Sequence, residues 1–233
     1  MSQMKQGNRW LKRPILRDII LGWQDGLVSV LGIVLGVATA TDSTRLVLIA
    51  GLASLFAEAA SMAAVAYTSS KAAQDYYFRE LRREQREVEE IPETEVREIR
   101  DIYSRKGFGG GELESIVRRI TSDKKLWVET MMAEELRLFP EEYQNPARSA
   151  GIVGFSDAIG SLLPLLPFFV WAPKLAIIPS VVISVVVLFG TGGMKARFTV
   201  GDWRRSGIEM ALVGFAAAVF GYVIGVLLGS TVP

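Results

Sequence analysis

The sequence predicts an all-α membrane protein of five transmembrane helices, with a charged three-helix domain inserted between the second and third spans. Half of the residues are hydrophobic, and the mean hydropathy is +0.28. Five apolar runs come close to the ~20 residues that a helix needs to cross about 30 Å of hydrocarbon. Of the 25 acidic residues, 18 lie between Lys71 and Glu142. This partition separates a polar, acidic domain from the membrane part of the chain.

The five candidate spans are residues 18–41, 46–68, 149–170, 174–193 and 207–229. The linker TDSTR between the first two is short, so we expect these two helices to be antiparallel. Pro164, Pro167 and Pro179 predict kinks or broken backbone hydrogen bonding in the third and fourth spans. The predicted domains are residues 1–68, with the first two spans, 69–147, the cytosolic domain, and 148–233, with the last three spans.

The second span continues into the charged domain as one long helix. No glycine or proline interrupts the chain from Leu52 to Ile91, and helical periodicity survives the change from apolar to polar residues. A second charged helix is expected from Glu93, after the Ile91-Pro92 turn, and a third over about residues 123–139. The three helices would together form the inserted domain.

Basic residues set the predicted orientation. The segment before the first span contains Lys5, Arg9, Lys12, Arg13 and Arg17. The loop between the fourth and fifth spans contains Lys195, Arg197, Arg204 and Arg205. The two opposite loops hold only Arg45 and Lys174. The positive-inside rule therefore places the N-terminus and the charged domain in the cytosol. The N-terminal segment has no short apolar run with a cleavage site, so no cleaved signal peptide is expected.

The chain has no cysteine and no histidine. Thiolate and imidazole metal ligands are thereby excluded, as is the Glu-x-x-His pattern of di-iron oxidases. No nucleophile–base set is present either, so we expect no enzyme. Any metal chemistry must use carboxylates, thioethers and backbone oxygens.

Ionisable residues inside the spans are the first functional candidates, since each costs ~2.5–3.5 kcal/mol or more unless it is paired or hydrated. They are Asp18, Asp25, Glu58 and Asp157, and Met62 lies one helical turn after Glu58. The structural alternatives are a helix cap for Asp18, buried hydrogen bonds for Asp25 and Glu58, and ordinary packing for Met62. For Asp157 a structural and a functional role are equally compatible with the sequence. Carboxylates with one thioether would suit a path for a divalent transition ion such as Fe²⁺, and could take protons when the ion leaves.

The cytosolic domain carries a second set of candidate ligands. Two Glu-x-x-Glu pairs and a Met-Met-x-x-Glu motif supply Glu84, Glu87, Glu95, Glu98, Met131, Met132 and Glu135. On three helices these side chains could converge on several divalent ions. The alternative is a solvated charged face, for which Arg79, Arg82, Arg83 and Arg86 offer ion-pair partners.

Small residues recur along the first span. Gly22 with Gly26, and Gly32 with Gly36, form small-xxx-small pairs that let helix backbones approach closely. Such pairs predict either tight helix contacts within the subunit or a homodimer through this span.

These motifs together resemble the vacuolar iron transporter family. The matching stretches are DIILGWQDGL, GLASLFAEAASMAAVAY, YYFRELRREQREVEEIPETEVREI and MMAEEL, and the similarity covers about residues 17–229. The resemblance implies a homodimer that moves Fe²⁺ and related ions out of the cytosol in exchange for protons. It also implies an ion path between subunits at Asp18, Asp25 and Met62, and a cytosolic metal-binding domain that uses the seven ligands above.

One position departs from the family pattern. The family's second helix usually has a glutamate where this chain has Ser54, and a small residue where it has Glu58. The two positions are one helical turn apart, so we expect Glu58 to replace the missing carboxylate about 6 Å further along the helix.

The sequence thus favours a proton-coupled transporter of Fe²⁺, and also of Mn²⁺; the alternative is a membrane-anchored metal buffer or sensor without transport. The expected partners are divalent metal ions, protons, membrane lipid and a second copy of the chain. No prosthetic group and no nucleic-acid partner are expected. A chain of this length without targeting extensions resembles prokaryotic members, which indicates the plasma membrane.

Overall fold

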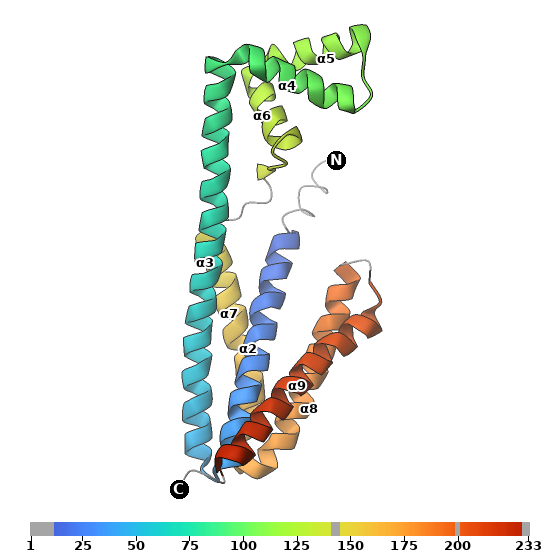
Figure 1. The fold of residues 1–233 in the computed structure, drawn as a ribbon. Helices are drawn as coiled ribbons and strands as arrows, with labels where there is room; N and C mark the ends of the chain where they lie inside the picture. Colours follow the sequence, from blue (N-terminus) through green and yellow to red (C-terminus); the bar gives the residue numbers. More distant parts are fainter. Residues whose placement is uncertain (1–11, 141–144, 199–200, 230–233) are drawn as a thin grey trace, which may run out of the picture. The chain divides into compact units, whose positions relative to one another are not determined.

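The computed structural model describes residues 12–140, 145–198 and 201–229, and these residues form helices and no strand (Figure 1). In chain order the elements are α2 (Lys12–Ala40), α3 (Thr44–Glu90), α4 (Pro92–Arg105), α5 (Gly110–Thr121), α6 (Lys124–Glu134), α7 (Pro146–Leu165), the 3₁₀ helix η2 (Leu166–Phe169), α8 (Pro173–Phe198) and α9 (Trp203–Gly229). The predicted all-α class is therefore confirmed.

Five of the helices are long and apolar enough to cross a membrane: α2, α3, α7 with η2, α8 and α9. The prediction of five spans is confirmed. The first helix begins earlier than expected, at Lys12, so Asp18 lies well inside α2 and is not its N-terminal cap. The helix-cap interpretation of Asp18 is wrong.

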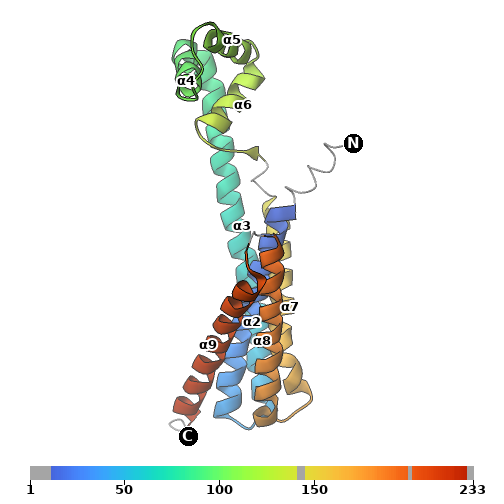
Figure 2. The same cartoon turned by 90° about the vertical axis from the view of Figure 1, so that its right-hand side faces the viewer.

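Contacts divide the chain into two units, one of residues 1–68 with 146–233 and the other of residues 69–145. The long helix α3 contributes its first part to the membrane unit and its last part, residues 69–90, to the second unit. We refer to residues 69–90 as the arm. In the membrane unit α2 packs on α7 and α9, and α8 packs on α9 (Figure 2). Its largest core cluster is Val30, Leu31, Val34, Leu35, Ala38, Val47, Leu55, Leu165, Phe168, Ala176 and Ala218.

Both small-residue pairs of α2 are used inside the subunit. A Cβ atom on Gly26 would come within 2.3 Å of the backbone oxygen of Asp157 in α7. On the α9 side, a Cβ on Gly221 would lie 2.1 Å from the backbone oxygen of Gly32. The absence of side chains is therefore what allows these backbones to approach, and the within-subunit interpretation of the pairs is confirmed.

The prolines disturb the third span but not the fourth. Helix α7 ends at Leu165, just after Pro164, and continues as the 3₁₀ turn that contains Pro167. The Ser180 hydroxyl donates a hydrogen bond of 2.7 Å to the carbonyl of Pro164. This bond from α8 satisfies a carbonyl where the regular pattern changes. Helix α8 runs through Pro179 without ending.

The second unit contains one helix more than we predicted. Beside the arm, α4 and α6 lies α5, whose Leu113, Val117 and Ile120 are buried at helical spacing. The third predicted helix, 123–139, is shorter in the structure, because α6 ends at Glu134. Three residues later Arg137 adopts a left-handed backbone (φ 56°), which terminates the helical path. The core of this unit is Val88, Ile99, Leu113, Val117, Ile120, Trp127, Val128, Met131 and Met132.

Candidate metal sites

The arm and α4 bring four of the predicted ligands together. Helix α3 ends at Glu90 and α4 begins at Pro92, a residue that is compatible with the first turn because it has no N–H to leave unpaired. Glu84 on the arm and Glu95 on α4 are buried, with exposures of 1% and 3%. Burial and the nearby charges of Glu98, Glu84 and Glu87 raise the pKa of Glu95 to about 7.

Glu135 joins this group from the C-terminal end of α6. Partial burial of its carboxyl and the charges of Glu98 and Glu84 raise its pKa to about 7. The pKa of Glu84 is also raised, by burial and by Glu87. Three elements therefore place five carboxyl groups within electrostatic reach of one another: Glu84, Glu87, Glu95, Glu98 and Glu135. We call this set the cytosolic carboxylate cluster, after the orientation that the basic residues predict.

Arg83 neutralises one side of the cytosolic carboxylate cluster. Its guanidinium donates to Glu84 at 3.2 Å and to Glu87 at 3.3 Å. It also lies 2.7 Å from Glu80, which is 5% exposed. Glu80 is a buried acid that the sequence prediction missed, although its position one turn before Glu84 could have indicated it.

The cluster is not a preformed metal site in the described part of the chain, where no three acidic side chains are placed to hold one ion. Two of its carboxylate oxygens nevertheless fit a cation. Oε2 of Glu84 and Oε2 of Glu95 are buried, and neither has a hydrogen-bond partner within the described ranges. Such oxygens are costly to bury alone, and a divalent ion would supply the missing partner.

Met131 and Met132 lie in the hydrophobic core of the second unit, with exposures of 0% and 2%. They pack with Val88 and Ile99 of the arm and α4. Their position accounts for the two residues as packing, and their ligation of a metal remains a prediction.

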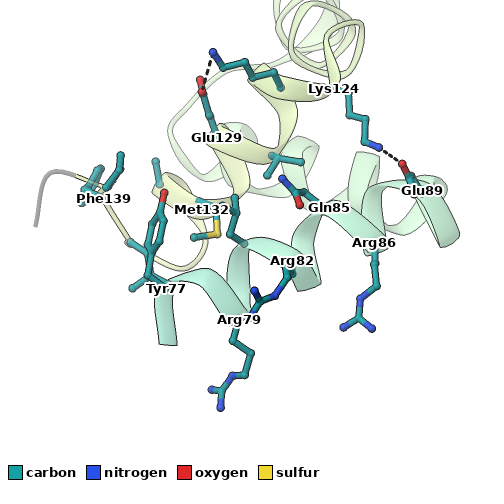
Figure 3. Close-up of a pocket in the computed structure, with 16 residues that line it drawn as sticks. Tyr77, Arg79, Arg82, Gln85, Arg86, Glu89, Lys124, Glu129, Met132 and Phe139 are labelled. Atoms are coloured by element: carbon teal, nitrogen blue, oxygen red, sulfur yellow. Dashed lines mark hydrogen bonds and ion pairs between the residues drawn. The ribbon is translucent and has the colours of Figure 1, made fainter. Parts of the chain in front are cut away.

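A cleft of about 1310 Å³ lies between the arm and α6, and Figure 3 shows its lining. Its charged residues are Arg79, Arg82, Arg86, Lys124, Lys125, Glu89 and Glu129. Lys124 pairs with Glu89, and Lys125 lies 3.8 Å from Glu129. The surplus of positive charge makes this cleft unsuitable for a cation, and none of the five cluster carboxylates lines it.

In the membrane unit, Asp18 is buried and hydrogen-bonded. The Ser149 hydroxyl of α7 donates to its carboxylate at 2.6 Å, and Arg17 lies 3.4 Å away. The exposure of Asp18 is 2%. Asp18 therefore links α2 to α7 at the end of the membrane unit where both helices begin.

Asp25 of α2 and Glu58 of α3 are half-buried, and their charges act on each other. The side chains of Ser54 and Ser29 lie near the carboxylate of Glu58, whose Oε2 is buried and has no hydrogen-bond partner within the described residues. Met62, one turn further along α3, is also half-buried. Ser54 stands where the family usually has a glutamate. It therefore lies beside the Glu58 carboxylate, which we expect to take the place of that glutamate.

Acidic side chains buried in several membrane-spanning helices, without basic residues in equal number, are typical of a protein that moves ions across a membrane. The carboxylate cluster in the second unit indicates that the ions are cations. The fold and these two groups of acids thus define the class of ion transporters.

Comparison with known proteins identifies the family. The model of the VIT family matches residues 16–226. The chain is 39% identical to vacuolar iron transporter 2 of Oryza sativa over 210 residues, which cover 89% of this chain and 85% of that protein. It is 33% identical to vacuolar iron transporter 1 of Arabidopsis thaliana, with 90% and 84% covered, and 32% identical to the vacuolar iron transporter of Plasmodium falciparum, with 97% and 86% covered. The chain belongs to the VIT family, so it is a metal ion transporter and not an enzyme.

Proposed function

We propose that this protein is a proton-coupled transporter that moves Fe²⁺, and also Mn²⁺, out of the cytosol. The observation that carries the proposal is the pair of half-buried acidic residues Asp25 and Glu58, which lie on two membrane-spanning helices within electrostatic reach of each other. Without a cation or protons, each ionised carboxylate would cost several kcal/mol at this depth. A divalent ion neutralises both carboxylates at once, and protons can replace it when it leaves.

The choice of Fe²⁺ is supported by the names of the relatives and by Met62. The relatives are named iron transporters, and a thioether next to carboxylates favours a softer ion than Mg²⁺ or Ca²⁺. Mn²⁺, an intermediate ion with similar oxygen ligands, is the second expected substrate.

A homodimer would complete the path. In the single chain Asp25, Glu58 and Met62 are only partly covered, and much of the apolar surface of α3 is exposed, including Phe56 at 69% and Val65 at 55%. Half-covered carboxylates would meet lipid in a monomer, which is unfavourable. A second copy packed on this side would enclose them, and the ion path would run between the subunits.

The cytosolic carboxylate cluster would collect ions for the membrane path. Its carboxylates must be deprotonated to bind metal. Met131 and Met132 are proposed as additional soft ligands, since the three rotatable bonds of methionine allow the sulfur to turn without moving the helix. We place the N-terminus and this domain in the cytosol on the basis of the flanking basic residues.

Transport by purified protein in lipid vesicles tests the proposal. We expect uptake of Fe²⁺, kept reduced by ascorbate, to be accelerated by a pH gradient that is acidic on the receiving side. Asp25→Asn should reduce the uptake rate to that of empty vesicles, whereas Asp42→Asn, in the loop after α2, should leave it unchanged. The alternative, a membrane-anchored buffer, predicts metal binding without uptake. Wild-type vesicles that bind Fe²⁺ but do not accumulate it would favour this alternative.

A further inference from the structure

Asp157 is an acidic residue inside the third span whose carboxyl is left without a partner by the residues that the structure describes. It lies in α7 and its exposure is 0%. Neither carboxylate oxygen has a hydrogen-bond partner among the residues that the structure describes. Asp18, the other fully buried acid of the membrane unit, is in contrast bonded to Ser149. A buried carboxyl without a partner is strongly unfavourable in a protein interior, so packing alone does not explain it.

The carboxyl of Asp157 faces the helix that carries Asp25. Gly26 of α2 lies against it: a Cβ on Gly26 would come within 2.9 Å of Oδ2 of Asp157 and within 2.4 Å of the hydroxyl oxygen of Ser161. Ser161 lies one turn after Asp157 on α7 and is also fully buried, and its hydroxyl has no partner in the described ranges. Two unsatisfied oxygen groups therefore point at the same glycine, next to Asp25 in the chain.

The charges around Asp157 are all negative. Those that act on it are Asp25 of α2 and Glu58 of α3, and no lysine or arginine of the described chain contributes. Three carboxyl groups from three helices thus share one region of the membrane unit. Their mutual repulsion is relieved by a bound cation, or by protons in its absence, since the described residues place no basic side chain there.

We propose that Asp157 is a third cation-binding residue of the membrane path, acting with Asp25 and Glu58, and that Ser161 supplies a neutral oxygen beside it. The ligand class is a divalent metal ion that accepts oxygen ligands. The inference rests on the proposed transport function, and it adds an acidic group from α7 to a path that otherwise uses α2 and α3. Gly26 provides the space for these oxygens, because any side chain there would displace them.

Substitution of Asp157 tests the inference in vesicles that contain the full-length protein. Asp157→Asn keeps the size and hydrogen-bonding capacity of the side chain but removes its charge. We expect its Fe²⁺ uptake rate at low metal concentration to fall at least tenfold, with a raised KM, and Asp157→Glu to retain more activity than Asp157→Asn. Asp42→Asn is the control, since it makes the same substitution in the loop after α2, where Asp42 pairs with Lys174 at 2.8 Å. An Asp157→Asn protein with wild-type rate and KM would overturn the inference while leaving the proposed function intact.

A second measurement uses only the wild-type protein and does not depend on the folding of a variant. Dicyclohexylcarbodiimide is an apolar reagent that reacts with protonated carboxyl groups in membrane interiors, and the modified residue is located by peptide mass spectrometry. We expect Asp157 to be labelled in metal-free protein and to be protected by Mn²⁺ at concentrations that saturate uptake. Labelling of Asp157 that is unchanged by Mn²⁺, in protein that transports Mn²⁺, would contradict the inference. Wild-type protein that transports no metal would instead remove the proposed function on which the inference rests.

Discussion

The guanidinium of Arg83 donates a hydrogen bond of 3.2 Å to the buried carboxylate of Glu84. The same guanidinium reaches Glu80 and Glu87, so one positive charge stands among three acids. In the metal-free protein Arg83 thus takes the electrostatic place of the cation that we expect the cytosolic carboxylate cluster to bind. Metal binding and the Arg83 ion pairs compete for the same oxygens.

Replacement of Arg83 should therefore strengthen metal binding. We expect Arg83→Gln to raise the affinity for Mn²⁺ by about threefold to tenfold, where tenfold corresponds to about 1.4 kcal/mol. Isothermal titration calorimetry at pH 7.5 measures the change. Arg82→Gln is the matched control, because it removes the same charge from the adjacent position, where the side chain lines the basic cleft (Figure 3). Equal affinity changes in the two variants would show that only the net charge matters.

The stability of the metal-free protein should fall as the pH rises. The pKa values of Glu95 and Glu135 are raised to about 7 in the folded protein, from an ordinary value of 4.5. Between pH 4.5 and 7 the folded state therefore binds more protons than the unfolded state, and the free energy of unfolding decreases with pH in that window. The loss is complete above about pH 7, where these groups are ionised in both states.

Glu95→Gln provides the control for this pH dependence. The variant should unfold about 2–4 °C higher than the wild type at pH 8, which corresponds to about 1 kcal/mol in a chain of this size, and the difference should vanish near pH 4.5. Thermal unfolding in detergent with a chelator present measures both proteins. A wild-type protein that becomes more stable than Glu95→Gln as the pH rises would contradict this assignment.

Glu58 should be essential for transport, and its position on α3 should be partly exchangeable with that of Ser54. We expect Glu58→Gln to abolish Fe²⁺ uptake without changing the oligomeric state, because the side chain keeps its size and loses only its charge. Ser54→Glu introduced into Glu58→Gln should restore part of the uptake, since it returns the carboxylate one turn away on the same face. Uptake assays in vesicles, with the elution volume of each variant as a control, test both steps. Retained uptake in Glu58→Gln would show that this carboxylate is not on the path.

Close packing of α2 on α9 predicts a stability effect that is independent of metal. A methyl group at Gly221 would lie 2.1 Å from the Gly32 backbone oxygen, so Gly221→Ala must separate the two helices. We expect a destabilisation of about 1–3 kcal/mol, as is usual for overpacking. Gly190→Ala in α8 is the control, because no heavy atom lies within 4 Å of its added Cβ. Melting temperatures in detergent compare the two, and equal values would refute the packing argument.

Local patterns in the sequence predicted the membrane part of the fold well, because the length and hydropathy of a span are local properties. The continuation of α3 into the arm and the break near Ile91-Pro92 followed from the absence and then the presence of a helix breaker. Helix α5 was not predicted, although its three buried positions at helical spacing could have indicated it. The helix begins in a run of glycines, Gly109 to Gly111, and because such runs are typical of turns, no helix was expected there.

The site was less predictable, because it depends on contacts between distant residues. The bond between Ser149 and Asp18 joins positions 131 residues apart, and no local pattern indicates it. The burial of Met131 and Met132 in the core depends on the end of α6 and on α4. Glu80 was overlooked although it lies one turn before Glu84, because this spacing fits a solvated face as well as a buried ion pair.

Location of the bound metal tests the central claim most directly, namely that a divalent cation neutralises acids within the membrane-spanning helices. Crystals of the full-length protein soaked with Fe²⁺ under reducing conditions, or with Mn²⁺, would reveal the ions by anomalous scattering. The account predicts an anomalous peak within coordination distance of Asp25 or Glu58, in addition to peaks at the cytosolic carboxylate cluster. Peaks confined to the cytosolic cluster, with Asp25 and Glu58 both hydrogen-bonded in dry helix contacts, would contradict it.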